Sequence, residues 1–206
     1  MPPAPARPYQ PPAHVSFVGS FPSLQSLPKA RLPEIAMAGR SNVGKSSAIN
    51  ALLGTRIARV SRTPGRTQSL NLFQVGEVLT LVDLPGYGYA RVPEEVRQSW
   101  KGMIEGYLIE RPTLALVVLL VDASVPAQVL DRELIEGLQG ADIPLRVVAT
   151  RVDRLTKSAR KPTLARLAEG LGLAGDVLLP VSSKTGENID VLWTILSRIA
   201  ARRRAD

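Results

Sequence analysis

Residues 39–46 of the chain (GRSNVGKS) match the phosphate-binding pattern GxxxxGK[ST] without a mismatch. In this pattern the glycines let the backbone approach a phosphate closely, the lysine supplies a positive charge, and the last hydroxyl is placed to ligate Mg2+. Lys45 and Ser46 take these two places. The alternative is a glycine-rich turn that fits the pattern by chance, but the flanking segments have the form that a phosphate loop requires.

A second motif, DxxG, occupies residues 83–86, with Leu84 and Pro85 between its two defining residues. A carboxylate at the end of a strand beside a phosphate loop can hold Mg2+ through water, and the Gly86 N–H can contact a γ-phosphate. One DxxG alone indicates little. Behind a complete phosphate loop, it favours a nucleoside triphosphate as the ligand.

Asp153 indicates which nucleotide is bound. Its carboxylate can accept hydrogen bonds from N1–H and the exocyclic amine of guanine, whereas adenine presents no such pair of donors, so the sequence predicts GTP rather than ATP. The usual motif is [NT]KxD, and residues 150–153 (TRVD) carry Arg151 in place of lysine. Arginine can also lie against a purine, but with a different geometry. Backbone N–H groups at Ser182 and Ser183 could contact the guanine O6.

The spacing of apolar residues predicts the strands and helices that position these motifs. Residues 34–38 can be a buried strand, and the apolar residues after the phosphate loop recur at helical spacing. Residues 70–75 and 78–82 read as a hairpin, and the apolar run 114–121 reads as a strand covered on both faces. Alternating helices and strands complete a three-layer α/β domain with a mostly parallel six-stranded sheet and one antiparallel edge hairpin. All the motifs then lie at the carboxyl ends of strands, on one edge.

The rest of the chain flanks this domain. We expect a disordered proline-rich tail over residues 1–13, an N-terminal extension and linker over 14–33, the nucleotide-binding domain over 34–201, and a basic tail over 202–206. Residues 54–69 form a long polar loop with several arginines, and such loops are usually functional.

The composition excludes some kinds of site and of protein. The chain has 206 residues, no cysteine, and a net charge of +8. Disulfides and thiolate metal sites are therefore excluded, and no apolar run is long enough to span a bilayer. We expect a cytoplasmic protein without a membrane partner. The positive charge allows contact with RNA, and it equally serves solubility.

Four strings make the sequence similar to a known family: residues 39–47 (GRSNVGKSS), 63–68 (TPGRTQ), 83–90 (DLPGYGYA) and 150–153 (TRVD). They resemble the EngB-type (YihA/YsxC) bacterial GTPases of the TRAFAC class. Over residues 14–200 the resemblance implies a Ras-like G domain that binds GTP and Mg2+ and acts in late assembly of the large ribosomal subunit. It also implies a link to cell division and septation.

The resemblance implies roles for individual residues as well. Ser46 and Thr67 would be direct Mg2+ ligands, with Asp83 acting through water, and residues 65–69 would close over the γ-phosphate. The expected nucleotide-binding residues are Gly39, Arg40, Ser41, Asn42, Val43, Gly44, Lys45, Ser46, Ser47, Gly65, Arg66, Thr67, Gln68, Ser69, Asp83, Leu84, Pro85, Gly86, Thr150, Arg151, Val152, Asp153, Val181, Ser182 and Ser183.

Lys45, Thr67, Gly86 and Asn42 are the candidates for catalytic roles. Tyr87 stands where many G proteins place a water-orienting glutamine after DxxG, so intrinsic turnover should be slow and should wait for a partner. Asn42 resembles the loop asparagine of potassium-activated GTPases, where K+ replaces an arginine finger. It is equally read as a residue that tolerates a tight turn.

These observations leave three functional hypotheses. The first is a monomeric GTPase that acts as an assembly switch, in which GTP orders residues 61–69 and 85–92 into a surface for the large ribosomal subunit or its precursors. The second is a nucleotide-gated RNA- or ribosome-binding module with negligible hydrolysis. The third, a phosphoryl transferase that uses ATP, is disfavoured by Asp153.

Overall fold

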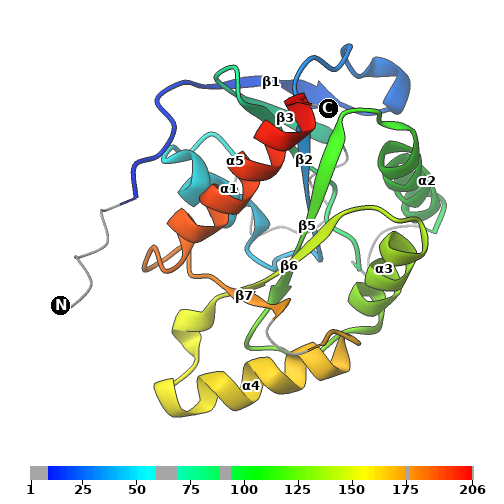
Figure 1. Cartoon of the computed structure of the whole chain (residues 1–206). Coiled ribbons are helices and arrows are strands. Elements are labelled where there is room, and N and C mark those ends of the chain that lie inside the picture. The colour runs from blue at the N-terminus through cyan, green and yellow to red at the C-terminus, as the bar shows by residue number, and fades with distance from the viewer. Residues whose placement is uncertain (1–8, 59–68, 89–93, 175–176, 206) are drawn as a thin grey trace.

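The computed structural model describes residues 9–58, 69–88, 94–174 and 177–205, and it forms one sheet with helices on both faces (Figure 1). The strands are β1 Val15–Phe21, β2 Glu34–Gly39, β3 Leu70–Val75, β4 Leu79–Asp83, β5 Leu114–Asp122, β6 Leu145–Thr150 and β7 Leu179–Pro180. The helices are α1 Lys45–Leu53, α2 Glu94–Glu110, α3 Val129–Gly140, α4 Lys157–Gly170 and α5 Ile189–Ala205, with short 3-10 turns at Leu24–Ser26 and Val152–Arg154.

The sheet has the order β1-β3-β4-β2-β5-β6-β7, in which β3 runs antiparallel to both of its neighbours and the other pairings are parallel. Helices α1 and α5 cover one face, where Ile49, Leu52 and Leu192 pack against β2 and β5. Helices α2, α3 and α4 cover the other face. The predicted three-layer α/β fold is confirmed, because β2 and β5 are buried on both sides as their apolar sequences require.

The prediction of six strands is wrong by one. Residues 15–21 form β1, which pairs with β3 from Val15 opposite Val75 to Phe21 opposite Leu70, with a bulge between Phe17 and Gly19. The β3–β4 hairpin is therefore not the edge of the sheet. An extended segment does not reveal its partner by periodicity, and here β1 satisfies the backbone groups that an exposed β3 would leave unpaired.

Two predicted tails are partly structured. Helix α5 continues through Arg202, Arg203 and Arg204, so these residues are helical rather than a separate tail. Arginines near a helix C-terminus interact favourably with the helix dipole. Tyr9, which we expected in a disordered segment, packs against the α1–α5 side of the core and donates its hydroxyl to the Leu52 carbonyl. Residues 1–8 lie outside the described residues.

The topology brings one end of the sheet together as a ligand edge. Strands β2, β4, β5 and β6 are neighbours and parallel, so their carboxyl ends meet at Gly39, Asp83, Asp122 and Thr150. Within the described ranges, none of the helices is long and apolar enough to cross a membrane.

Candidate nucleotide-binding site

The phosphate loop connects β2 to α1 through backbone conformations that only some residues accept. Gly39 has φ 155°, and a Cβ added there would lie 2.8 Å from the Leu120 carbonyl oxygen and 2.9 Å from a Val43 methyl group. Gly44 has φ 98°, and Asn42 has φ 66° although it is not glycine. These positive φ values turn the chain sharply from strand to helix. Asparagine is among the residues that tolerate this region best.

Helix α1 begins at Lys45 directly after the loop, and Gly44 at its N-cap has no side chain to pair with the first helical N–H groups. Ser46 and Ser47 lie in the first turn, which carries no acidic residue. The orphan N–H groups and the positive end of the helix dipole therefore face the same place. Such an arrangement of N–H groups can bind a phosphate group.

Lys45 and Asp83 form a buried ion pair between the start of α1 and the end of β4. The lysine is 8% exposed and the aspartate 4% exposed. Because a buried charge is costly without a partner, each group offsets the cost of burying the other beside the loop.

The oxygen donors at this position fit Mg2+. Ser46 offers a hydroxyl and Asp83 a carboxylate, which are ligands that hard cations prefer. No group of three His, Cys, Asp or Glu side chains that could enclose a metal occurs in the described parts of the chain. One carboxylate and a hydroxyl suit Mg2+ in particular, since this ion is usually held by few protein ligands together with nucleotide phosphates.

The DxxG segment is bonded to the phosphate loop along its backbone. The Ser41 N–H donates to the Tyr87 carbonyl at 3.0 Å, and the Ser41 hydroxyl donates to the Gly86 carbonyl at 3.2 Å. A Cβ on Gly86 would lie 3.0 Å from the Ser41 hydroxyl, so a side chain at this position would crowd the phosphate loop. Leu84 is buried, and its N–H donates to the Met37 carbonyl of β2 at 3.1 Å. Pro85 lies between them.

Tyr87 is anchored away from the loop. Its hydroxyl donates to the Asp131 carboxylate at 2.7 Å, which ties the DxxG segment to α3. Burial raises the pKa of Asp131, while the Tyr87 hydroxyl and the charge of Arg40 act in the opposite direction. Burial and the nearby Asp131 also raise the pKa of Tyr87, so the phenol stays protonated.

At the end of β6, consecutive residues hold consecutive carbonyls of the phosphate loop. The Thr150 hydroxyl donates to the Val43 carbonyl at 2.7 Å, and Arg151 donates to the Asn42 carbonyl at 2.5 Å. Arg151 also bonds to Asp122 at the end of β5 at 2.5 Å. Its side chain runs past Gly44, which places its stem beside the loop.

The candidate base-reading residue, Asp153, follows in the turn after β6. Val152 is buried, and its N–H lies 3.5 Å from the Val181 carbonyl, so the turn is fixed next to residues 181–183. The Ser182 hydroxyl donates to the Asp153 carboxylate at 2.6 Å. This hydrogen bond is the main cause that lowers the pKa of Asp153, which keeps the carboxylate ionised as an acceptor.

The expected role of Ser182 needs a correction. Its backbone N–H donates to the Glu187 carbonyl at 3.1 Å, so it is not directed at a base oxygen. Its hydroxyl instead orients Asp153 and accepts from the N–H groups of Lys184 and Thr185. Ser183 follows as a half-buried residue, and its predicted contact with guanine remains a prediction.

The remaining predicted switch residues lie mostly beyond what is described. Gly65, Arg66, Thr67 and Gln68 are outside the described residues, and so are residues 89–92 of the second segment, 85–92, that GTP is expected to order. Ser69 is described and half-buried just before β3.

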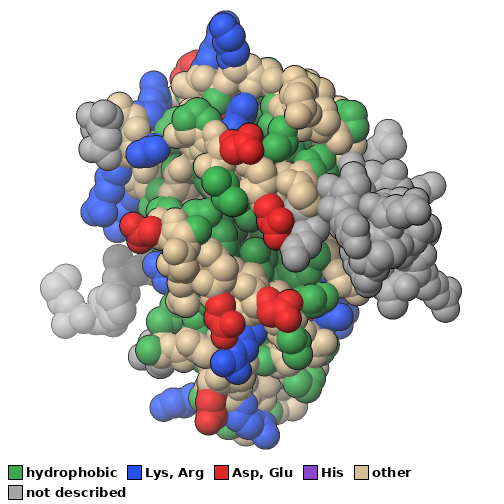
Figure 2. Space-filling view, turned by 90° about the vertical axis from the view of Figure 1, so that its right-hand side faces the viewer, with side chains coloured by type: hydrophobic (Ala, Val, Ile, Leu, Met, Phe, Trp, Pro, Cys, Tyr) green, Lys and Arg blue, Asp and Glu red, His purple; other side chains and the backbone are tan. Residues whose placement is uncertain are grey.

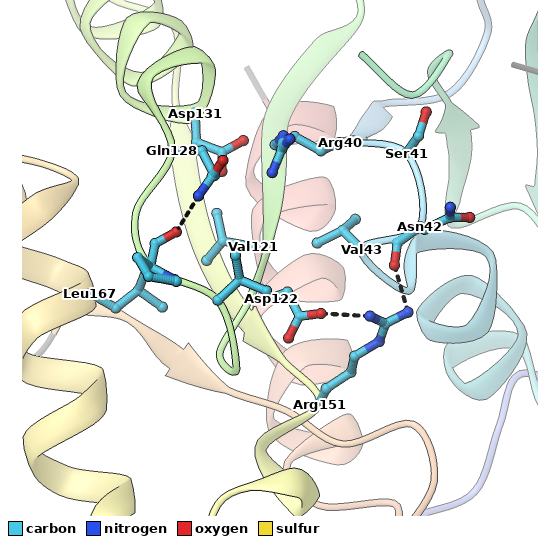
Figure 3. A pocket seen from close by; sticks show the side chains of 12 residues that line it. Arg40, Ser41, Asn42, Val43, Val121, Asp122, Gln128, Asp131, Arg151 and Leu167 are labelled. Atoms are coloured by element: carbon cyan, nitrogen blue, oxygen red, sulfur yellow. Dashed lines mark hydrogen bonds and ion pairs between the residues drawn. The ribbon is translucent and has the colours of Figure 1, made fainter. Parts of the chain in front are cut away.

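A cavity of about 220 Å³ opens beside the phosphate loop (Figure 3). Its polar lining comes from Arg40 and Asn42 of the loop, Asp122 and Arg151 at the strand ends, and Asp131 of α3. Lys45, Ser46 and Asp153 do not line it, so the cavity neighbours the predicted phosphate and base sites without being either one.

Three side chains at this edge had no role assigned from the sequence: Asp122, Asp131 and Glu187. Asp122 ends a strand that is otherwise apolar, and this position at the ligand edge is a signal that could have identified it. Asp131 and Glu187 gave no such signal, because their side-chain partners Tyr87 and Arg160 are far from them in sequence.

Comparisons with known proteins agree with this geometry. Residues 34–151 match the family described as "50S ribosome-binding GTPase". The chain is 44% identical over 186 residues to "Probable GTP-binding protein EngB" from Geobacter sulfurreducens, which covers 90% of each chain. It is 46% identical over 180 residues to the protein of the same name from Enterobacter sp., covering 86% of each chain.

Solved structures of GTP-binding proteins have a similar fold. A crystal structure of a probable GTP-binding protein engB superposes with a TM-score of 0.69 at 26% identity, covering 82% of this chain and 99% of the other. Aquifex aeolicus Era bound to GDP.AlF4- shares the fold, with a TM-score of 0.66 at 21% identity over 83% of this chain and 57% of that one.

Proposed function

Because the chain belongs to the EngB family of GTP-binding proteins, we propose that it hydrolyses GTP to GDP as a switch in the assembly of the large ribosomal subunit. The observation that carries the choice of nucleotide is Asp153, held ionised by Ser182 at the same sheet edge as the phosphate loop. The proposal extends to a need for the protein in normal cell division and septation, on the strength of the resemblance alone.

The contacts within the site support a proposed role for each residue. Lys45 and the first N–H groups of α1 neutralise the phosphate oxygens. Ser46 and Thr67 would ligate Mg2+ and Asp83 would hold it through water. The ion would supply positive charge that offsets the charge developing during phosphoryl transfer. Gly86 contacts the γ-phosphate through its N–H. In this proposal Lys45 and Asp83 move apart when GTP and Mg2+ bind, since the lysine turns to the phosphate oxygens and the carboxylate to the ion.

Slow intrinsic turnover is supported by Tyr87. Its hydroxyl is directed at Asp131 on α3, so it is not placed to orient an attacking water. We propose that ribosomal RNA or a ribosomal protein supplies the missing group or reorders the two switch segments. Asn42 is an exposed loop residue that could ligate K+ as an alternative source of positive charge.

Co-sedimentation with ribosomal subunits in GDP and in a non-hydrolysable GTP analogue tests the switch. We expect the chain to pellet with the large subunit or its precursor in the GTP analogue and to remain in the supernatant in GDP. Equal distribution in both nucleotides would contradict the switch. Chelation of Mg2+ with EDTA should weaken GTP binding, and Ser46→Ala should make binding less sensitive to EDTA.

Single-turnover hydrolysis separates the enzyme from the alternative of a binding module with negligible hydrolysis. We expect faster turnover when large-subunit precursors are added. Comparison of KCl with NaCl, for the native chain and Asn42→Ala, tests the use of K+. Equal rates in all four conditions would remove K+ from the mechanism.

A further inference from the structure

Arg151 makes two strong contacts with parts of the site that are distant in sequence. One terminal nitrogen donates to the Asp122 carboxylate at 2.5 Å, and the other donates to the Asn42 carbonyl at 2.5 Å (Figure 3). The guanidinium thus bridges the end of β5 and the phosphate loop, while its own backbone belongs to the turn that presents Asp153. Three segments of the site meet on this one side chain.

Asp122 is itself held in place. One of its carboxylate oxygens accepts from the Ser124 N–H at 2.9 Å and from the Ser124 hydroxyl at 2.6 Å, which leaves the other oxygen for Arg151. Burial acts to raise the pKa of Asp122, but the hydrogen bonds from Ser124 and Arg151 outweigh it and lower the pKa. Asp122 is therefore a fixed anion against which Arg151 is oriented.

The contacts of Arg151 and Thr150 set the direction of the loop peptides. Asn42 stands at φ 66°, a conformation that asparagine tolerates better than most residues but that still costs energy unless its surroundings hold it there. Thr150 holds the next carbonyl, that of Val43. Because the peptide is planar and trans, this fixed carbonyl turns the Gly44 N–H to the opposite side, away from Thr150. The hydrogen bonds that hold the loop carbonyls therefore also set the direction of the loop N–H groups, which lie on the side where phosphate is expected.

We propose that Asp122 is a positioning residue for nucleotide binding, which acts by holding Arg151 on the Asn42 carbonyl and so couples the base-reading turn to the phosphate loop. Asp122 does not touch the nucleotide in this arrangement. Asp122 acts through Arg151, and we expect this effect to require an arginine at position 151. The planar fork of a guanidinium presents separate nitrogens to two acceptors, whereas a lysine ammonium is a single point of charge.

The test rests on the proposed function and measures the affinity for GDP in six proteins, which are the native chain and five variants. Asp122 and Asp122→Asn are each combined with Arg151, Arg151→Lys and Arg151→Ala. With Arg151 present, we expect Asp122→Asn to weaken GDP binding about tenfold, because a charge-assisted hydrogen bond that orients the arginine is lost. The effect should be smaller with lysine and absent with alanine.

The outcome that overturns the proposal is an equal effect of Asp122→Asn in all three backgrounds, or no effect beside Arg151. An equal effect would mean that Asp122 acts through the Ser124 turn instead. If Asp122→Asn does not fold, the comparison of the native chain with Arg151→Ala decides, since equal GDP affinities for the two would show that no side-chain donor at this position supports the loop. Glu136→Gln is the matched control, because Glu136 pairs with Arg132 on the exposed surface of α3.

The ratio of GDP to XDP affinity separates this proposal from the proposed function. Asp122→Asn should leave the ratio unchanged, because Asp153 reads the base. A changed ratio would contradict a purely positioning role for Asp122. If the native chain does not prefer GDP at all, the guanine assignment itself has failed, whatever Asp122 does.

Discussion

Individual side chains at the ligand edge are placed by hydrogen bonds that leave them little freedom. Asp153 is oriented by Ser182, Arg151 by Asp122, and Tyr87 by Asp131. In each pair a charged or polar group that could act on a ligand is held by a second residue from another element. Substitutions at this scale should therefore change nucleotide selectivity or the pH dependence of stability.

Asp153→Asn should shift the preference of the chain from guanine to xanthine nucleotides. An amide offers one donor and one acceptor in place of two acceptors, which suits the oxygen at position 2 of xanthine better than the amine of guanine. We expect the ratio of GDP to XDP affinity to fall at least about tenfold in a competition assay. Asp142→Asn is the control, because Asp142 is exposed in the loop before β6. An unchanged ratio would refute the role of Asp153.

Tyr87→Phe should destabilise the fold in a manner that depends on pH. Burial raises the pKa of Asp131 above its usual 3.8, and loss of the hydroxyl should raise it further. The hydroxyl favours the ionised form of Asp131, so the loss is full above the raised pKa of Asp131 in the variant and shrinks as pH falls to the lower, but still raised, pKa of Asp131 in the native chain. We expect a loss of about 2 kcal/mol at pH 7 in urea unfolding.

The same series with Asp131→Asn provides the control for this pH dependence. Without an ionisable group at position 131, the effect of Tyr87→Phe should no longer vary between pH 4 and pH 7. A loss that is equally large at both pH values in the native background would contradict the assignment to Asp131.

At the scale of elements, the carboxyl and amino ends of the parallel strands differ in what they carry. The carboxyl ends carry the ligand site, while the amino end of β2 is held by a buried network. Glu34 is 2% exposed and accepts from Arg111 at 2.7 Å and from the Tyr107 hydroxyl at 2.8 Å. Arg111 also donates to the Pro28 carbonyl, which fixes the linker before β2. This network joins α2, the linker and the central strand.

Arg111→Met should strongly destabilise the chain, because it leaves the Glu34 carboxylate buried without its cation. We expect a loss of about 3 kcal/mol in the free energy of unfolding. The double variant Glu34→Leu with Arg111→Met should recover much of that loss, since no unpaired charge remains. Arg132→Met, which removes the arginine of an exposed pair, should cost less than about 1 kcal/mol. Equal losses for the two arginines would contradict a structural role for the buried network.

At the scale of the whole molecule, the excess positive charge is unevenly distributed. Figure 2 shows Asp and Glu side chains in the middle of the face that carries α2 and α3, with Lys and Arg mostly toward its rim. The arginines at the end of α5 lie at the edge opposite the ligand site, where Arg203 donates to the Pro112 carbonyl and Arg204 to the Glu77 carbonyl. They are thus engaged in fixing the helix.

Binding to ribosomal subunits should weaken steeply with salt if RNA phosphates are contacted. Three such contacts to single-stranded RNA would lower the affinity about 20-fold for a fourfold rise in salt concentration. The double variant Arg203→Ala with Arg204→Ala should preserve the difference between GDP and the GTP analogue, because both residues are remote from the ligand edge. Loss of that difference in co-sedimentation would place the nucleotide-controlled surface at the end of α5 instead.

The sequence alone was enough to predict the fold class, the order of the central elements and the positions of the motifs. These depend on local patterns: glycines that permit positive φ, apolar runs that must be buried, and polar residues where strands end. Residues 39–46, 83–86 and 150–153 are therefore readable without a structure. The pairing of β1 with β3 was not, because an extended segment does not encode which strand edge it will join.

The tertiary structure decided which side chains hold the motifs in place. Asp122 and Arg151 are far apart in the chain, as are Tyr87 and Asp131, and no spacing rule relates the members of either pair. Their meeting depends on the order of parallel strands, which brings distant strand ends to one edge. Only the folded chain shows that the arginine in place of the usual lysine has an aspartate and a loop carbonyl to bind.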